Sequence, residues 1–205
     1  MTLLVVASGN AHKVGELAEL LQEAVAGLEV VGLDHFGEAP FIDETADTFE
    51  GNAMLKASGI ATWLASLDVD PQTWVLADDS GICVDALGGD PGVRSARYAG
   101  DHASDADNNR KLVAELRRSG IDRSAARYEC VLALQRVGGG PVHRFGGRWD
   151  VEVRVEARGS GGFGYDPHAW IDGGAATVAE LDRPAKAQVS HRGRALRKLV
   201  AGWPG

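Results

Sequence analysis

The sequence predicts a mixed α/β protein in which αβ units flank a central antiparallel meander. Two observations support this fold class. Near both ends of the chain, apolar residues recur at the 3.6-residue spacing of helices, next to short apolar runs typical of buried strands. Between residues 127 and 156 the spacing changes to the two-residue alternation of half-buried strands. The 205 residues, 44% of them hydrophobic, suffice for a single domain (residues 1–205) built of one core or of two small lobes.

The N-terminal part predicts a strand, a loop and two helices. The apolar run at 3–7 is interrupted by polar residues at 8–10, after which apolar residues recur at helical spacing from 17 to 25. A second amphipathic helix is expected from about 49 to 67, with Asp47 or Thr48 as its N-cap.

A buried strand is expected at 74–77. It is followed at once by two carboxylates, Asp78 and Asp79, and then by Ser80 and Gly81, which favour a tight turn. Neighbouring carboxylates repel each other unless a cation or a proton relieves them, so the end of this strand is a candidate metal site. Asp-Asp-Ser-Gly is also ordinary turn chemistry, and that alternative stays open.

The next elements are a rigid glycine- and proline-rich loop at 88–92 and a third helix. Ser104 or Asp105 is expected to cap this helix, and Gly120 to end it.

The meander is predicted from two alternating stretches, 127–135 and 151–156, with a turn at 138–141. Beyond a glycine-rich segment at 159–167, we expect a short strand and a short helix near 175–181. A final helix should follow, capped near Ser190.

The charge and composition of the chain argue against nucleic acids and membranes as its partners. The net charge of −8 lacks the basic footprint of a nucleic-acid binder. The first residues carry no basic targeting region, and no apolar stretch approaches the roughly 18 residues of a membrane span. We therefore expect a cytoplasmic protein with no nucleic-acid or membrane partner. Cys83 and Cys130 lie in apolar contexts, which predicts reduced core residues.

The loop Ser8-Gly9-Asn10-Ala11-His12-Lys13 is a candidate anion site. It lies between a strand and a helix, where backbone N–H groups at the helix N-terminus attract negative charge. Its glycine spacing is not that of a Walker A loop. Simple N-capping by Asn10 is the alternative.

Acidic residues also precede the second helix. Asp43 and Glu44 could serve only the helix dipole. However, Glu44 together with Asp79 would supply two hard oxygen ligands, the usual protein contribution to a Mg²⁺ ion that takes its remaining ligands from water and substrate phosphates. Sequence alone does not decide between Asp43 and Glu44, and we favour Glu44.

Two further clusters lie near the C-terminus. Gly162-Phe163-Gly164-Tyr165-Asp166-Pro167 surrounds aromatic rings with glycines, as expected of a loop that lets a ring lie flat on a planar ligand. Lys186, His191 and Arg192 form a cationic group in an otherwise acidic chain.

Taken together, these motifs resemble the signature of the inosine/xanthosine triphosphate pyrophosphatases, and the resemblance covers the whole chain. The matching motifs are Ser-Gly-Asn-x-x-Lys at 8–13, Thr-Phe-x-x-Asn-Ala at 48–53, Ala-Asp-Asp-Ser-Gly at 77–81, Pro-Gly-Val-Arg-Ser-Ala-Arg-Tyr at 91–98, Gly-Phe-Gly-Tyr-Asp-Pro at 162–167 and Ser-His-Arg-Gly at 190–193. The chain differs from the usual pattern in having Arg183-Pro184-Ala185 before Lys186.

The resemblance implies an elongated, two-lobed α/β fold with a long mixed sheet and a central active-site cleft, and a homodimer. It also implies Mg²⁺-dependent hydrolysis of non-standard purine nucleoside triphosphates (ITP, dITP, XTP) to the monophosphate and pyrophosphate. Such a reaction would remove these nucleotides from the cellular pool.

The resemblance also assigns roles to residues. The triphosphate would lie against Ser8, Gly9, Asn10, Ala11, His12 and Lys13, with Lys56 nearby, and Ser80 would contact the substrate. The remaining substrate contacts would come from Phe163, Gly164, Tyr165, Asp166, Lys186, His191 and Arg192. Phe163 would stack on the purine, with Asp166, His191 and Arg192 addressing its edge. Glu44 and Asp79 would hold the metal. Asp79 and Lys13 would be catalytic, Asp79 as the general base or as the ligand that lowers the pKa of the attacking water.

Three alternatives remain open at this stage. The chain could be a pyrophosphatase for pyrimidine or modified nucleotides, a plain phosphatase that releases orthophosphate, or a nucleotide sensor without turnover. The adjacent Asp78 and Asp79 argue against a sensor, because extra negative charges weaken the binding of a triphosphate unless a metal ion is present. The segment 94–98 could line the site or a dimer contact, or could be structural.

Overall fold

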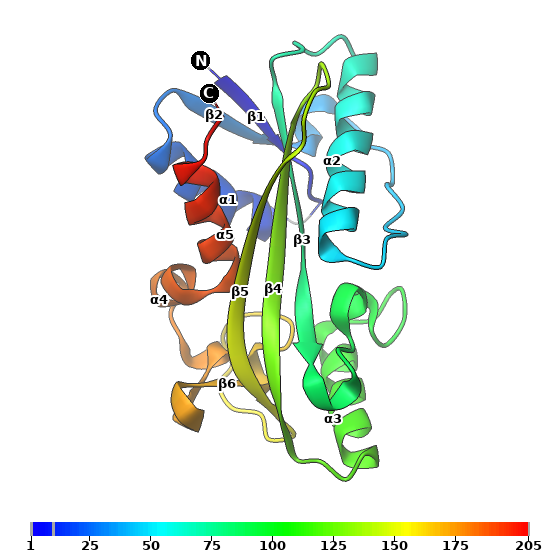
Figure 1. The fold of residues 1–205 in the computed structure, drawn as a ribbon, viewed down its shortest axis with the longest axis vertical. Coiled ribbons are helices and arrows are strands. Elements are labelled where there is room, and N and C mark those ends of the chain that lie inside the picture. Colours follow the sequence, from blue (N-terminus) through cyan, green and yellow to red (C-terminus); the bar gives the residue numbers. More distant parts are fainter. Residues whose placement is uncertain (1, 10, 205) are drawn as a thin grey trace. The chain divides into compact units, whose positions relative to one another are not determined.

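The computed structural model describes residues 2–9 and 11–204, and their side chains except those of Ala11, His12, Lys13 and Glu16. In this part of the chain a seven-stranded sheet has the order β2-β1-β3-β4-β5-β6-β7 (Figure 1). The strands are β1 (Thr2–Val6), β2 (Leu28–Gly32), β3 (Trp74–Val84), β4 (Arg123–Arg136), β5 (His143–Arg154), β6 (Ala169–Ile171) and β7 (Ala176–Thr177). The α-helices are α1 (Ala11–Ala24), α2 (Phe49–Ser66), α3 (Asp105–Arg118), α4 (Arg183–Val189) and α5 (His191–Ala201).

The sheet is mixed, as the sequence predicts. Strand β1 pairs in parallel with both β2 and β3. At the other edge β6 pairs antiparallel with β5 and β7. The parallel pairs belong to the predicted αβ part, and the antiparallel pairs join β5, in the predicted meander, to the strands that follow it. The α/β fold class is confirmed.

Contacts divide the chain into two compact units. The first unit comprises Met1–Asp79, Val131–Gly146 and Ala195–Gly205, and the second comprises Ser80–Cys130 and Gly147–Arg194. The unit boundary in β3 falls between Asp79 and Ser80. Each unit is described by itself below.

In the first unit, α2 covers β3 with an apolar face. Thr48 rather than Asp47 caps the helix, since the Thr48 hydroxyl accepts the Gly51 N–H at 3.0 Å. The buried face is small and aliphatic, which lets the helix lie close to the strand. It comprises Ala53, Ala57, Ile60, Ala61 and Leu64.

Truncation of this helix face is expected to destabilise the fold. Leu64→Ala removes a fully buried side chain and should lower the free energy of unfolding by about 2–5 kcal/mol. Leu55→Ala on the same helix is the control. Because Leu55 is 41% exposed, its replacement should lower the free energy of unfolding far less. Urea titrations of the two variants measure the difference. Equal shifts of the two unfolding midpoints would contradict this packing.

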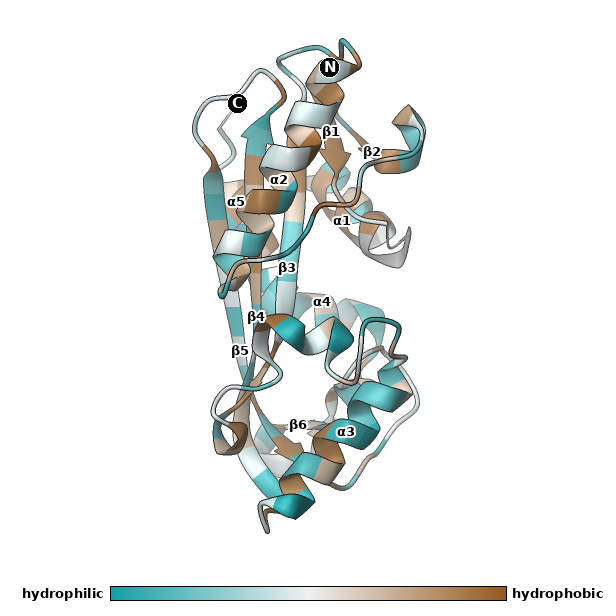
Figure 2. Ribbon diagram, turned by 90° about the vertical axis from the view of Figure 1, so that its right-hand side faces the viewer, coloured by the Kyte–Doolittle hydropathy of each residue, from teal (hydrophilic) through white to brown (hydrophobic). Residues whose placement is uncertain are grey.

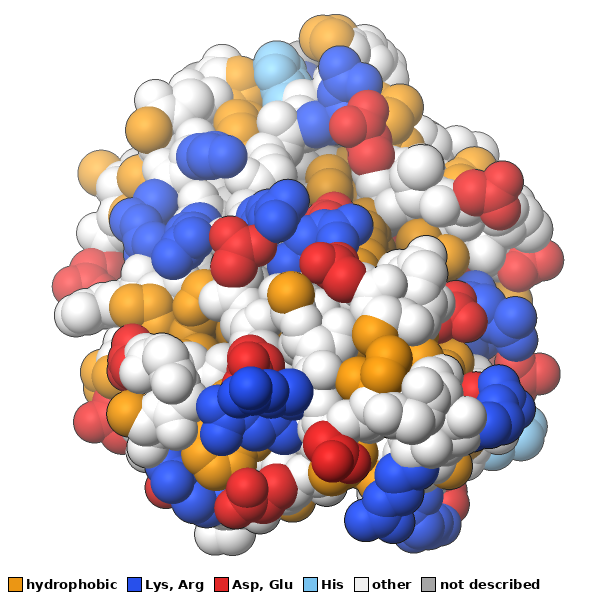
Figure 3. Space-filling model, turned by 60° about the horizontal axis from the view of Figure 1, so that its bottom comes forward, with side chains coloured by type: hydrophobic (Ala, Val, Ile, Leu, Met, Phe, Trp, Pro, Cys, Tyr) orange, Lys and Arg blue, Asp and Glu red, His pale blue; other side chains and the backbone are white. Residues whose placement is uncertain are grey.

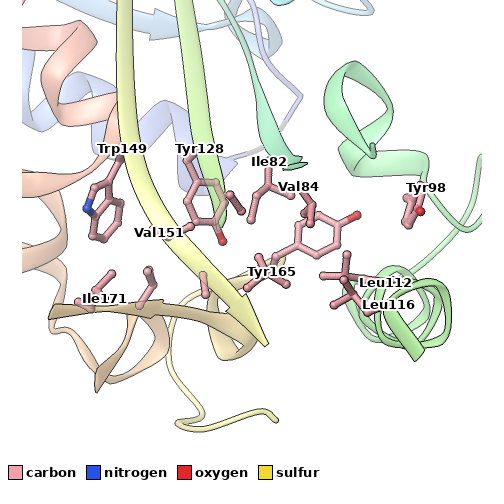
Figure 4. Packing of buried hydrophobic residues seen from close by; sticks show 14 residues of the cluster. Ile82, Val84, Tyr98, Leu112, Leu116, Tyr128, Trp149, Val151, Tyr165 and Ile171 are labelled. Atoms are coloured by element: carbon pink, nitrogen blue, oxygen red, sulfur yellow. The ribbon is translucent and has the colours of Figure 1, made fainter. Parts of the chain in front are cut away.

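In the second unit, aromatic rings from the sheet and a loop pack with aliphatic residues of β3 and α3 (Figure 4). Tyr128, Trp149 and Tyr165 lie in this cluster with Ile82 and Leu116. Helix α3 begins with a capping box formed by Ser104 and Asp107. Of the two residues predicted to cap this helix, Ser104 and Asp105, Ser104 is confirmed. Gly120, at φ +69°, follows its C-terminal end as predicted.

The strand expected at 74–77 does not end at the aspartates. Strand β3 continues through them to Val84, so the predicted turn at Ser80 and Gly81 is wrong. Gly81 serves a close approach instead, because a Cβ there would lie 2.4 Å from Ser95 Oγ and 2.6 Å from the Gly92 carbonyl oxygen. Apolar residues resume at Ile82, and Lys56 compensates charge within the strand, so the polar residues do not interrupt pairing.

One other expectation differs in detail from the structure, and two elements were not expected. The short helix expected near 175–181 is a 3-10 helix, Val178–Glu180, which strand β7 precedes; the Glu180 carboxylate accepts the Thr177 N–H at 2.7 Å. Strand β2 and helix α4 were not predicted. The signal for α4 is present in the sequence, since Asp182 caps it and Pro184 occupies its first turn.

The final helix is confirmed near Ser190, whose hydroxyl accepts the Gly193 N–H at 3.1 Å. Cys83 and Cys130 are buried and unbonded to each other, also as predicted. On the face shown in Figure 3, basic and acidic side chains are interspersed with apolar ones. None of the helices in the described part of the chain is long and apolar enough to cross a membrane.

Candidate active site

The sheet register places the start of the predicted phosphate loop beside the aspartates of β3. Val6 of β1 pairs with Leu76, and the Ala7 N–H donates to the Leu76 carbonyl at 2.8 Å. Ser8 and Gly9 therefore follow β1 at the level of Asp78 in the neighbouring strand. Of the rest of the predicted loop, Asn10 and the side chains of Ala11, His12 and Lys13 lie outside the described residues.

Lys56 brings together the acidic groups of the first unit. Its ammonium lies 3.0 Å from Glu44 Oε1 and 3.3 Å from Asp79 Oδ1, and it donates to the Asp78 carbonyl oxygen at 2.6 Å. These residues come from three elements: the segment before α2, helix α2 itself and strand β3. We call Glu44, Lys56, Asp78 and Asp79 the acid–lysine cluster.

The acid–lysine cluster carries an excess of negative charge. Its three carboxylates and one ammonium sum to −2 when all are ionised, and both aspartates are only 7% exposed. Burial raises the pKa of Asp79 despite the opposing charge of Lys56, and Glu44 and Asp78 raise it further. Burial lowers the pKa of Lys56, but the charges of Asp79, Glu44 and Asp78 outweigh this effect and raise it overall. A divalent cation would balance the excess charge.

The chemistry of the cluster fits the predicted Mg²⁺. Asp79 Oδ2 is buried and has no hydrogen-bond partner among the described residues. A buried carboxylate oxygen left in this state is costly, and a hard cation satisfies it. The described part of the chain has no group of three or more His, Cys, Asp or Glu side chains that could hold a metal ion. A site with only two carboxylate ligands suits Mg²⁺, because this ion keeps several waters and takes further oxygens from phosphates.

In the second unit, Asp166 holds the glycine-rich loop in place. Its Oδ2 accepts the Phe163 N–H at 2.9 Å and pairs with the Lys186 ammonium, and its Oδ1 accepts the Tyr128 hydroxyl at 3.3 Å. Burial and the Asp166 charge raise the pKa of Tyr128, which keeps this hydroxyl a donor. Gly162 has φ +73°, and a Cβ there would lie 2.1 Å from Asp166 Oδ2. The Asp166 carboxylate, expected at the edge of a base, is thus engaged within the protein.

Phe163 remains exposed while cations gather around its ring. Its exposed fraction is 47%, whereas Tyr165 and Asp166 of the same loop are buried. The Lys186 ammonium lies 4.1 Å from the ring centroid and the Arg192 guanidinium carbon 5.8 Å. Arg192 also donates to Ser80 Oγ at 3.1 Å. The structure therefore brings together four of the predicted substrate residues, namely Ser80, Phe163, Lys186 and Arg192, which we call the ring cluster.

His191 lies in the same unit and stacks on Tyr128. The ring centroids are 4.9 Å apart and the rings are nearly parallel, at 10°. Tyr128 contacts both Asp166 and His191, yet in the sequence it is only one residue of the alternating stretch 127–135. No local pattern distinguishes it from other strand residues, because its role depends on partners far along the chain.

Two predicted contact residues are anchored elsewhere. Tyr165 is buried, and its hydroxyl donates to the Ser95 carbonyl at 2.8 Å, so its side chain belongs to the core. Gly164 is held through its backbone by Asp105 at 2.6 Å and Asn109 at 2.8 Å of helix α3. Sequence reasoning missed these two anchors.

The segment 94–98 has a structural role at its centre. Ser95 is buried, its hydroxyl donates to the Gly92 carbonyl at 2.6 Å, and it accepts the Ile82 N–H at 2.9 Å. Of the alternatives that the sequence left open, the structural role holds for Ser95.

The mixed-sheet fold and the two clusters define an α/β protein with an acidic, lysine-bearing site and a cation-rich aromatic site. The family model that matches the chain is that of the Ham1 family, and the match covers residues 4–202. The chain therefore belongs to the Ham1 family.

Similar proteins cover almost the whole chain. It is 46% identical over 206 residues to a dITP/XTP pyrophosphatase of Nocardia farcinica, covering 98% of this chain and 94% of the relative. It is 44% identical to a dITP/XTP pyrophosphatase of Geobacter sulfurreducens, with 100% and 99% covered. Among solved structures, a HAM1 protein from Coxiella burnetii superposes with a TM-score of 0.87 at 36% identity, covering 98% of each chain.

Proposed function

We propose that this protein hydrolyses the non-standard purine nucleotides ITP, dITP and XTP to the nucleoside monophosphate and pyrophosphate. The relatives named above are dITP/XTP pyrophosphatases that match over nearly their full length. The structural observation that supports this function best is the buried Asp79, paired with Lys56 through one oxygen and lacking a partner for the other among the described residues.

In the proposed reaction a water attacks the α-phosphorus. A new bond forms between the water oxygen and the phosphorus, the bond to the oxygen bridging to the β-phosphate breaks, and pyrophosphate leaves. Bound Mg²⁺ would neutralise phosphate charge and act as a Lewis acid, with Glu44 and Asp79 as its protein ligands. Lys56 adds a positive charge at this cluster, and Lys13 is proposed to do so in the phosphate loop. Asp79 either accepts the proton of the attacking water or, as a metal ligand, helps to lower the pKa of that water.

The ring cluster is proposed to bind the base. The exposed Phe163 ring offers a stacking surface, and the Arg192 and His191 side chains supply N–H donors. Hypoxanthine and xanthine present a carbonyl acceptor at position 6, whereas adenine presents an amino donor. Donors placed to meet a carbonyl would face adenine without a partner. We also propose, from the resemblance to the pyrophosphatases, that the protein works as a homodimer.

The experiment that tests this function is incubation of the purified protein with ITP, with and without Mg²⁺, scored for pyrophosphate and orthophosphate. We expect IMP and pyrophosphate in equal amounts, and a loss of turnover on metal removal. Orthophosphate as the first product would favour a plain phosphatase. Binding without turnover would favour a sensor, and a preference for pyrimidine triphosphates would overturn the choice of substrate.

A further inference from the structure

The acidic segment before α2, residues 42–47, has neither helical nor strand structure. It runs alongside α2 in both ribbon views (Figures 1 and 2). No backbone ladder fixes this segment, so side-chain contacts, among them those with the helix, hold Glu44 in place.

Helix α2 meets the acidic segment at three successive levels. At Gly59 a Cβ would lie 2.6 Å from Ile42 Cδ1, so a glycine there lets the segment approach the helix. One turn earlier, Lys56 pairs with Glu44. At the third level, a Cβ on Gly51 would lie 2.5 Å from Ala46 Cβ.

Asn52 makes the hydrogen bond at this third level. Its side-chain Oδ1 accepts the Ala46 N–H at 2.9 Å, and the residue is fully buried at 0% exposure. Its Nδ2 has no partner among the described residues. A buried donor without a partner is unfavourable, so a fully buried Asn at this position needs an explanation. Its acceptor oxygen holds the backbone two residues beyond Glu44, which no apolar residue could do. An aspartate would hold it too, but would add a fourth negative charge near the acid–lysine cluster.

We propose that Asn52, together with the space left by Gly51, is a positioning residue that fixes Glu44 against Lys56 and thereby sets the affinity of the acid–lysine cluster for a divalent cation. Asn52 acts through the backbone of Ala46 and is not itself a ligand. The part of this inference that concerns the cation rests on the proposed function, whereas the part that concerns the acidic segment does not.

The first test variant is Asn52→Leu, which keeps much of the volume and removes the acceptor. We expect hydrogen exchange of the Ala46 amide to rise at least about tenfold, because its side-chain acceptor is lost. The Mg²⁺ concentration for half-maximal ITP hydrolysis should rise about 10–100-fold, the usual effect of removing an outer partner of a metal ligand. At saturating Mg²⁺, kcat should stay within about threefold of the parent value.

Asn108→Leu is the matched control. Asn108 is also a buried helix residue whose Oδ1 accepts a loop amide, that of Ala99 at 2.8 Å, but it lies in the second unit. This variant should lose comparable stability, while the Mg²⁺ requirement and the exchange of residues 42–47 stay unchanged. The comparison separates positioning from a general loss of stability.

A second variant tests the same contact if Asn52→Leu folds poorly. Gly51→Ala keeps Asn52, raises the helix propensity of α2 and pushes on Ala46. We expect it to raise the Mg²⁺ requirement, because the added Cβ displaces Ala46 and with it the acidic segment. Gly15→Ala on α1 is its control, because a Cβ there meets nothing within 4 Å.

Unchanged exchange of the Ala46 amide in both test variants would overturn the inference, and so would an unchanged Mg²⁺ requirement. If the parent protein does not hydrolyse ITP, the proposed function fails. The exchange comparison would still decide whether Asn52 positions the acidic segment.

Discussion

Replacing Asp79 with asparagine is expected to lower kcat for ITP hydrolysis by about 10²–10⁴-fold. Asparagine keeps the shape of the side chain but removes its charge and the proton-accepting carboxylate. Both roles open to Asp79, metal ligand and general base, are lost together. The measurement is pyrophosphate release under saturating ITP and Mg²⁺.

The same substitution should not destabilise the metal-free protein. Burial raises the pKa of Asp79 above its ordinary value, so ionisation of this group weakens the folded state as the pH rises through that pKa. Asparagine removes this effect, but it also removes the charge that contributes most to raising the pKa of Lys56, which keeps Glu44 as an ion-pair partner. Because the two changes oppose each other, an unfolding midpoint at neutral pH close to that of the parent is expected. It would show that lost activity is not lost folding.

Asp85→Asn is the control for Asp79→Asn. Asp85 directly follows the same strand, is exposed, and pairs with Arg127 at 3.1 Å. Its replacement should leave ITP hydrolysis unchanged. If the Asp79 variant retained turnover within tenfold of the parent, Asp79 would not be the catalytic carboxylate.

The second large effect expected is discrimination against ATP. The ratio of kcat/KM for ITP to that for ATP should reach about 10⁴ or more, because a site built to donate to a carbonyl leaves its buried donors without partners when adenine enters. Steady-state rates across a panel of purine triphosphates measure this ratio. Comparable turnover of ATP would contradict the proposed recognition of the base.

Two substitutions separate stacking from recognition of the edge of the base. Phe163→Ala should raise KM for ITP about ten- to hundredfold through lost stacking, with the ITP-to-ATP ratio largely preserved. Arg192→Met keeps the volume but removes the N–H donors, so it should reduce the ratio itself. Phe41→Ala is the control for Phe163→Ala, since Phe41 is 90% exposed and outside the ring cluster. If Phe163→Ala and Phe41→Ala raised KM equally, Phe163 would have no special role in stacking.

Much of the fold could be predicted because it depends on near neighbours in the chain. Helices α2 and α3 follow from apolar spacing and from caps at Thr48 and Ser104, which act within three residues. The prediction of secondary structure failed where a contact with a residue far away in the chain overrode the local sequence pattern. The polar pair of β3 reads as a strand end, yet Lys56 on another element stabilises it and the strand continues.

The candidate site shows the same division. Composition and residue order were enough to predict the α/β class, the family resemblance and the polar residues of the site. The contacts among those residues follow from packing: Lys56 joins Glu44 to Asp79, Asp166 accepts the Phe163 N–H, and Asn52 accepts the Ala46 N–H. Lys56 and Asp79 lie 23 positions apart in the chain, and Ser80 and Arg192 lie 112 apart. Contacts at such separations are set by how helices and strands pack, and no local pattern of residues encodes them.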